Sequence, residues 1–146
     1  MAGEIDAALR RRVSERADHL CEYCLVHEDD TYLACEVDHI LSLKHGGLTA
    51  PENLAFACFD CNRHKGSDVG SVAGASREFV RFFNPRLDKW TGHFFLDRFK
   101  IVPLTEIGEA TARILQFNNR ERLLRRGAVI EAGRYPGIAA LARLRD

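Results

Sequence analysis

The chain has 146 residues, of which 46% are hydrophobic, and its 21 basic residues balance its 21 acidic residues. This length suits a single domain over residues 1–146 with one small core, and the composition excludes a disordered or low-complexity chain. The N-terminus lacks the basic and apolar segments of a secretory signal, and the sequence has no apolar run long enough to cross a membrane. We therefore expect a cytoplasmic protein without a membrane partner.

The charges are unevenly distributed along the chain. Residues 1–61 carry 5 Lys and Arg against 12 Asp and Glu, whereas residues 62–146 carry 16 against 9. An acidic first half can attract a divalent cation, and a basic second half favours contact with phosphate. For any single charge, a solvated surface position is the alternative.

The first half is predicted to contain one long helix, two short strands and a second helix. Apolar residues recur at helical spacing between Glu4 and Leu20, which predicts an amphipathic N-terminal helix. A strand is expected over residues 33–40, another over residues 54–58, and a helix from about residue 60.

The second half is predicted to be mainly helical. Residues 66–76 are rich in Gly and Ser and predict a flexible connection. Residues 94–104 favour a strand or hairpin, and Thr105 is a suitable N-cap for a helix that ends near Asn118. A further helix is expected over about residues 120–132, followed by a short C-terminal helix.

Two Cys-x-x-Cys pairs carry the strongest chemical signal. They are Cys21 with Cys24 and Cys58 with Cys61. Each pair places two thiolates one tight turn apart, so the two pairs together can complete the tetrahedral shell of one Zn²⁺. Four protein ligands leave no open position, and we therefore predict one structural zinc per chain on reduced thiolates. The fifth cysteine, Cys35, is expected to be a buried strand residue.

Polar residues between and beside these pairs are candidates for catalysis. Asp38 and His39 end the first expected strand, Asn53 precedes the second, and Asn62 directly follows Cys61. An imidazole can take a proton from water near neutral pH, so His39 suits a general base. Asp38 and Asn62 offer the oxygen ligands that Mg²⁺ or Mn²⁺ prefers. The alternatives are a capping or turn role for Asp38, an N-cap for Asn62 and a turn-stabilising role for Asn53.

Five sequence elements in this order resemble the HNH endonucleases of the ββα-metal, or His-Me finger, group. They are Cys21-x-x-Cys24, Val37-Asp38-His39-Ile40, Gly46-Gly47, Asn53-Leu54 and Cys58-x-x-Cys61-Asn62-x-x-Lys65. The chain departs from the family at Asn62, where many members have His. This departure is similar to the subset that uses Asp and Asn as metal ligands.

The resemblance implies an α+β fold with a zinc-stabilised ββα-metal core at about residues 19–66, an N-terminal helix and a helical extension at about residues 77–146. It also implies a divalent-metal-dependent DNA endonuclease whose products carry 5′-phosphate and 3′-hydroxyl ends. Asp38 and His39 would both face the phosphate through a bend in the strand. Asn53 would bond the backbone near His39 and orient the base.

Phosphate contacts are expected from two sets of basic residues. Arg63 and Lys65 lie on the helix after the second cysteine pair, and Arg122, Arg125 and Arg126 cluster on one expected helix of the basic half. Duplex DNA is the expected partner, with RNA left open. The alternative function is a non-catalytic zinc module that binds nucleic acid or protein.

Overall fold

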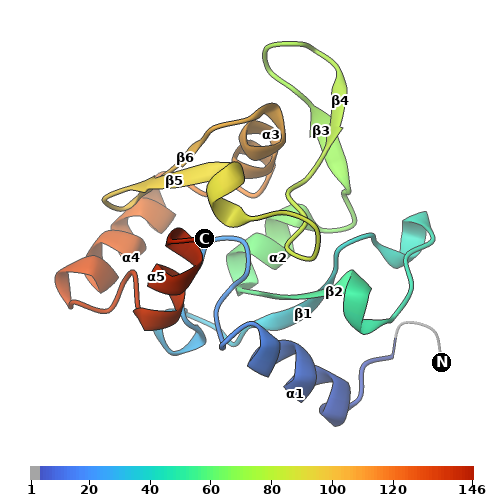
Figure 1. Ribbon diagram of the computed structural model, residues 1–146, viewed down its shortest axis with the longest axis horizontal. Coiled ribbons are helices and arrows are strands. Elements are labelled where there is room, and N and C mark those ends of the chain that lie inside the picture. The colour runs from blue at the N-terminus through green and yellow to red at the C-terminus, as the bar shows by residue number, and fades with distance from the viewer. Residues whose placement is uncertain (1–3) are drawn as a thin grey trace.

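A hairpin followed by a helix forms the centre of the first half of the chain. The computed structural model describes residues 4–146. Strand β1 (Glu36–His39) pairs antiparallel with β2 (Leu54–Ala57), and helix α2 (Phe59–Lys65) follows directly (Figure 1). The observed elements reproduce the predicted strand, strand and helix. Together with the helices of the second half, they give the expected α+β fold class.

Helix α1 (Ala7–Arg16) lies against this hairpin (Figure 1). The side chain of Asp6 caps its N-terminus by accepting a hydrogen bond from the backbone N–H of Leu9. The helix is shorter than the predicted span because the chain turns into left-handed backbone conformations at Asp18 and His19. Arg16 donates to the carbonyl oxygen of Leu54, so one helix arginine attaches α1 to β2.

The Gly- and Ser-rich connection contains a second hairpin, which corrects the prediction of a flexible linker. Strand β3 (Gly70–Val72) pairs antiparallel with β4 (Phe79–Arg81). A Cβ at Gly70 would lie 2.3 Å from the carbonyl oxygen of Val80, so glycine allows the two strands to approach closely here. Both strands contact helix α3 (Glu106–Ile114). The hairpin is therefore part of the packed structure.

The remaining elements of the extension follow the predicted order. Strand β5 (Phe94–Asp97) pairs with β6 (Lys100–Pro103), and Thr105 caps α3 as expected. The C-terminal helices are α4 (Arg120–Glu131) and α5 (Ile138–Leu144). Short 3₁₀ turns occur at Glu28–Asp30, Leu43–His45, Pro51–Asn53 and Trp90–Gly92.

Aromatic side chains build the core of the extension and join it to the first half. Phe94 is fully buried and contacts Phe83, Trp90 and Phe117 at ring-centroid distances of 5.5, 5.1 and 5.6 Å. The indole N–H of Trp90 donates to the carbonyl oxygen of Tyr23 at 2.9 Å. Tyr23 lies between the first two cysteines, so the extension packs directly on the predicted metal site.

Among residues 4–146, no helix combines the length and apolar character that crossing a membrane requires.

Candidate active site and metal centre

The four cysteines of the two Cys-x-x-Cys pairs come together in the interior. Their sulfur atoms all lie within 4.8 Å of one another, and all four residues, Cys21, Cys24, Cys58 and Cys61, are buried. Backbone N–H groups of Cys24 and Cys61 point at the sulfurs of Cys21 and Cys58, at 3.5 and 3.4 Å. A set of four thiol ligands at this spacing is arranged to hold a metal ion and fits a tetrahedral structural zinc.

Burial and mutual hydrogen bonds shift the pKa values of three of the four clustered thiols. Burial raises the pKa of Cys21 and of Cys61 well above the ordinary value. Hydrogen bonds from Cys21, Cys58 and Cys61 lower the pKa of Cys24. Burial therefore disfavours the thiolate forms of Cys21 and Cys61 when no cation is bound. A bound divalent cation offsets this penalty because it stabilises every thiolate.

The three residues predicted to perform chemistry line one surface cleft. Asp38 and His39 reach the cleft from the end of β1, and Asn62 reaches it from α2. Ser42 and Lys44, from the loop after β1, form part of the wall. Asp38 and His39 lie between the two cysteine pairs in sequence and Asn62 directly follows the second pair, and the fold brings this acid, imidazole and amide to one place.

Asp38 is held from inside the protein. The hydroxyl of Tyr23 donates to one carboxylate oxygen at 2.8 Å, and the ammonium of Lys65 donates to the other at 3.2 Å. Lys65 also donates to the carbonyl oxygen of His39. Burial raises the pKa of the Asp38 carboxyl, while Lys65 and Tyr23 oppose this shift. The network fixes the carboxylate at the floor of the cleft.

Asn53 bonds the backbone of the loop that follows His39. Its side-chain oxygen accepts from the backbone N–H of Leu41, and its amide donates to the carbonyl oxygens of Leu41 and Leu48, each at 2.9 Å. A Cβ at Gly47 would lie 1.7 Å from the carbonyl oxygen of Leu41. Close backbone packing therefore explains Gly47, whereas Gly46 is explained by its left-handed backbone conformation, with φ of 89°.

Three predicted phosphate contacts are corrected, because the side chains of Lys65, Arg122 and Arg126 are buried. Lys65 pairs with Asp38. Arg126 donates to the carbonyl oxygens of Phe99 and Phe117. These cations satisfy buried acceptors, and they are not available to phosphate at the surface.

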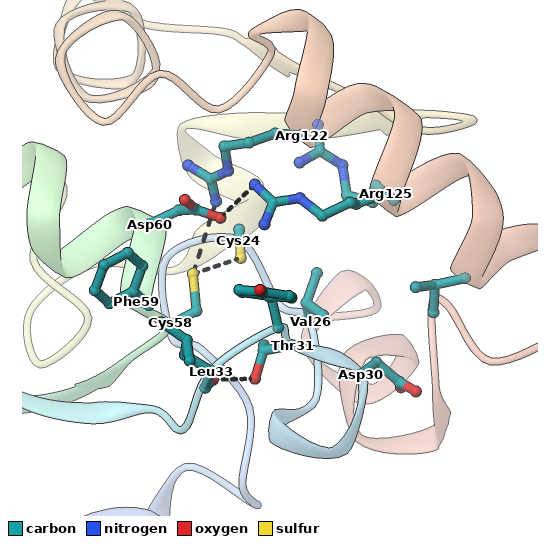
Figure 2. A pocket seen from close by; sticks show the side chains of 13 residues that line it. Cys24, Val26, Asp30, Thr31, Leu33, Cys58, Phe59, Asp60, Arg122 and Arg125 are labelled. Atoms are coloured by element: carbon teal, nitrogen blue, oxygen red, sulfur yellow. Dashed lines mark hydrogen bonds and ion pairs between the residues drawn. The ribbon is translucent and has the colours of Figure 1, made fainter.

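The other two predicted phosphate contacts differ from each other. The guanidinium of Arg125 forms an ion pair with Asp60 at 2.8 Å, which Figure 2 shows beside Arg122. Arg63 is exposed on α2, next to Asn62, with its guanidinium 5.5 Å from the centre of the Phe59 ring. Of the five basic candidates, Arg63 is the one whose side chain is exposed, and it follows Asn62 on α2.

Two residues of the site were missed in the sequence. Tyr23 holds Asp38, and its position inside the first cysteine pair was the available signal. The hydroxyl oxygen of Thr49 lies 2.9 Å from Nε2 of His39. Nothing in the spacing of the sequence marks Thr49, because the loop geometry alone brings it to the imidazole.

A strand–strand–helix unit with a buried cluster of four cysteines, and with an imidazole and a carboxylate in one cleft, defines a ββα-metal domain. Residues 21–68 match the family described as HNH endonuclease. This segment is therefore an HNH endonuclease domain, which indicates a nuclease in general terms, and residues 69–146 lie outside the match. Neither the search of curated proteins nor that of solved structures returned a match.

Proposed function

We propose that this protein is a divalent-metal-dependent endonuclease that hydrolyses phosphodiester bonds of DNA in the cleft of Asp38, His39 and Asn62. The observation that carries the proposal is that these three side chains line one cleft within the HNH segment. Phosphodiester hydrolysis needs a base for the attacking water and stabilisation of the charge on the phosphate. The cleft offers groups for both.

His39 is proposed as the general base. Its Nε2 lies 2.9 Å from the Thr49 hydroxyl, and its side chain is half-buried at the cleft. If Nε2–H donates to Thr49, the other ring nitrogen, Nδ1, carries the lone pair that accepts the proton of the attacking water. Water oxygen then bonds to phosphorus, and the 3′ oxygen leaves. The products carry 5′-phosphate and 3′-hydroxyl ends.

Asp38 and Asn62 are proposed to hold Mg²⁺ or Mn²⁺. The Asp38 carboxylate accepts hydrogen bonds from Tyr23 and Lys65, with the Lys65 ammonium 3.2 Å from both oxygens, and a carboxylate has about four lone-pair sites, so acceptor capacity remains. Within residues 4–146, the side-chain amide of Asn62 makes no hydrogen bond to another group. Two oxygen donors at one cleft fit a hard cation that keeps several water ligands. When bound, such an ion would stabilise negative charge on the phosphate and on the leaving oxygen.

The cation proposed here is distinct from the structural zinc. The cysteine cluster offers four thiols and no open position, whereas the cleft offers oxygen donors next to a basic nitrogen. Arg63 is the proposed phosphate contact beside the cleft because it is exposed and follows Asn62. Duplex DNA is the proposed substrate.

The test is cleavage of supercoiled plasmid over a titration of Mg²⁺ and of Mn²⁺, with wild type, His39→Ala and the matched control His45→Ala. His45 is exposed in the neighbouring turn. We expect His39→Ala to be about 10²- to 10⁴-fold slower, since this is the usual contribution of a general base. His45→Ala should cleave like wild type, and all three proteins should contain equal zinc.

Each other outcome of this experiment has a defined meaning. If wild type cuts under neither ion, the nuclease proposal fails and the non-catalytic zinc module replaces it. If His39→Ala cuts as fast as wild type, the assignment of the base is wrong. An RNA of matched sequence in the same assay tests the substrate, because faster cleavage of RNA would contradict the proposal of DNA.

A further inference from the structure

Arg122 reaches from the extension to the cysteine cluster. Its side chain is 5% exposed, and its Nη2 lies 3.1 Å from the sulfur of Cys61 and 3.8 Å from that of Cys58. Figure 2 shows the guanidinium extending from α4 toward Cys58, next to the Arg125–Asp60 ion pair. An arginine from outside the HNH segment therefore contacts two of the four predicted zinc ligands.

The other side of the guanidinium is fixed by the backbone. Nη1 of Arg122 donates to the carbonyl oxygen of Leu115 at 2.8 Å, and the group lies 5.7 Å from the centre of the Phe117 ring. A planar guanidinium held at several points has little freedom to turn away from the sulfurs. The contact with Cys61 and Cys58 is therefore a defined feature of the fold.

Charge gives this contact a role. A divalent ion bound by four thiolates has a formal charge of about −2, and a buried net charge is costly unless a counter-charge or hydrogen bonds compensate it. Across residues 4–146, Arg122 is the cation that hydrogen-bonds a cysteine sulfur. Nearby Arg125 is already paired with Asp60, and Lys65 with Asp38.

The sulfur atoms of the cluster receive hydrogen bonds from backbone N–H groups and from the side chain of Arg122. Cys21 and Cys58 each receive a backbone N–H from their own pair, at 3.5 and 3.4 Å. Cys61 receives its donor from Arg122. The guanidinium of arginine keeps its charge in proteins, so Arg122 brings a positive charge to the cluster.

We propose that Arg122 is a positioning residue of the metal centre, which compensates the negative charge of the zinc–thiolate cluster and thereby sets the zinc affinity and thiol reactivity of the HNH segment. The C-terminal extension would then contribute directly to metal retention. This inference does not depend on nuclease activity, since neither the charge nor the hydrogen bonds involve the cleft.

The experiment compares full-length wild type with Arg122→Met, Arg122→Lys and the matched control Arg126→Met. Arg126 is the suitable control because it is also a buried arginine of α4 that donates to backbone carbonyls, but it has no hydrogen bond to sulfur. Zinc affinity is measured by competition with a chelator at neutral pH, and thiol reactivity by the rate of alkylation of the zinc-loaded protein. Cobalt-substituted protein reports the sulfur-to-metal charge-transfer bands.

We expect Arg122→Met to bind zinc about 10- to 100-fold more weakly, which is the usual effect of losing an outer-shell partner. Its thiols should be alkylated faster, and its charge-transfer bands should move to longer wavelength, because thiolates without this hydrogen bond are more electron-rich. Arg122→Lys should lie between Arg122→Met and wild type. Arg126→Met should lose stability and should weaken zinc binding less than Arg122→Met, because Arg126 lies near the cluster but does not hydrogen-bond a sulfur.

Equal loss of zinc affinity in Arg122→Met and Arg126→Met would overturn the proposal, because the effect would then come from general damage to α4. Unchanged affinity and spectrum in Arg122→Met would overturn it as well. If Arg122→Met does not fold, Arg122→Lys and Arg122→Gln replace it. Their zinc affinities should then decrease in the order Arg, Lys, Gln, and equal affinities would reject the charge argument.

Discussion

The buried interior of the HNH segment is centred on a thiol cluster and a charged pair, whereas that of the extension is centred on aromatic side chains. Residues 21–65 bury four thiols and the charged pair of Asp38 and Lys65, with short strands of four residues each. Residues 79–146 bury an aromatic cluster centred on Phe94. Removing one partner of a buried polar or metal-binding group leaves the other partner without compensation, which costs several kcal/mol of stability. Removing atoms from an apolar cluster lowers stability roughly in proportion to the volume lost. The two regions should therefore fail in different ways.

The largest effect is expected from removal of zinc, either by chelation or by Cys58→Ser. Structural zinc contributes about 10–16 kcal/mol of binding free energy in zinc-finger peptides, so its loss should cost several kcal/mol of folding free energy here. Zinc content and thermal unfolding measure the effect. Hydrogen exchange should show loss of protection in β1, β2 and α2 before α3 and the β5–β6 hairpin.

Cys35→Ser is the matched control for this prediction. Cys35 is buried but lies outside the set of four clustered cysteines, so this variant should keep its zinc. If chelation removed hydrogen-exchange protection equally and at the same rate from both regions, the HNH segment and the extension would not have separate sources of stability.

The next largest effect is expected from Phe94→Ala in the extension. Truncating a fully buried phenylalanine should reduce the free energy of unfolding by about 3–5 kcal/mol. Zinc stoichiometry should remain one per chain, because no cysteine ligand is altered. Urea unfolding measures the loss of stability, and metal analysis measures the zinc content. Phe95→Ala, at the exposed neighbouring residue, is the control. Loss of zinc from folded Phe94→Ala would argue against separate sources of stability.

The sequence predicted the HNH segment well because its signals are local. Cysteine spacing fixes the cluster, and the Asn53 and Gly47 positions fix the loop after His39. The β1–β2 hairpin and α2 followed from the same pattern. The interior contacts of Asp38 were not predicted: the position of Tyr23 inside the first cysteine pair was an available signal, but Lys65 was interpreted as a phosphate contact.

The extension was predicted at the level of elements but not of side-chain roles. Its hairpin and helices followed from turn and periodicity signals, and the structure confirms them. The arginines of α4 had the spacing of a basic surface, yet Arg122 and Arg126 are buried. Charge in a sequence does not indicate exposure when buried carbonyl or sulfur acceptors are brought to the same place by packing. The Gly-rich residues 66–76 were misread for a related reason, because β3 gains its order from β4 and α3.

A moderate effect is expected from Asn53→Ala in the loop beside the cleft. The change removes hydrogen bonds to Leu41 and Leu48, each contributing about 1 kcal/mol, and should lower stability by about 1–3 kcal/mol. Cleavage should slow more than stability alone explains, because the loop after His39 loses its anchor. Chemical unfolding and single-turnover cleavage of folded protein measure the two effects.

Asn53→Asp and Glu52→Ala complete this comparison. Asn53→Asp keeps the acceptor for Leu41 N–H but turns a carboxylate oxygen toward the carbonyl oxygens of Leu41 and Leu48, so it should be at least as destabilising as Asn53→Ala. Glu52 is an exposed residue of the same turn, and its removal should leave cleavage unchanged. If Asn53→Ala cleaved at the wild-type rate, the loop would not orient His39.

The smallest effect is expected from Arg81→Met, at an ion pair on the surface of the extension. Arg81 donates two hydrogen bonds to Asp88, at 2.7 and 3.0 Å, and these bonds lower the pKa of Asp88 below its ordinary value of 3.8. The folded state therefore favours the charged carboxylate. This contribution is fully present above the ordinary pKa and disappears as pH falls through the lowered folded pKa. Because the Arg81 side chain is 46% exposed, the loss at pH 7 should stay below about 1 kcal/mol.

The pH dependence of Arg81→Met distinguishes charge from packing. The stability difference between wild type and Arg81→Met should be constant between about pH 7 and pH 5 and should shrink below about pH 4, where the carboxylate becomes protonated. Unfolding followed by hydrogen exchange in β5 and β6 reports the extension alone, since acid also releases zinc from thiolates. Arg77→Met, an exposed arginine in the β3–β4 turn, is the control. A difference that persisted undiminished at pH 3 would mean that Arg81 stabilises the extension by packing its methylene groups, and the extension would then contain no measurable electrostatic contribution at this pair.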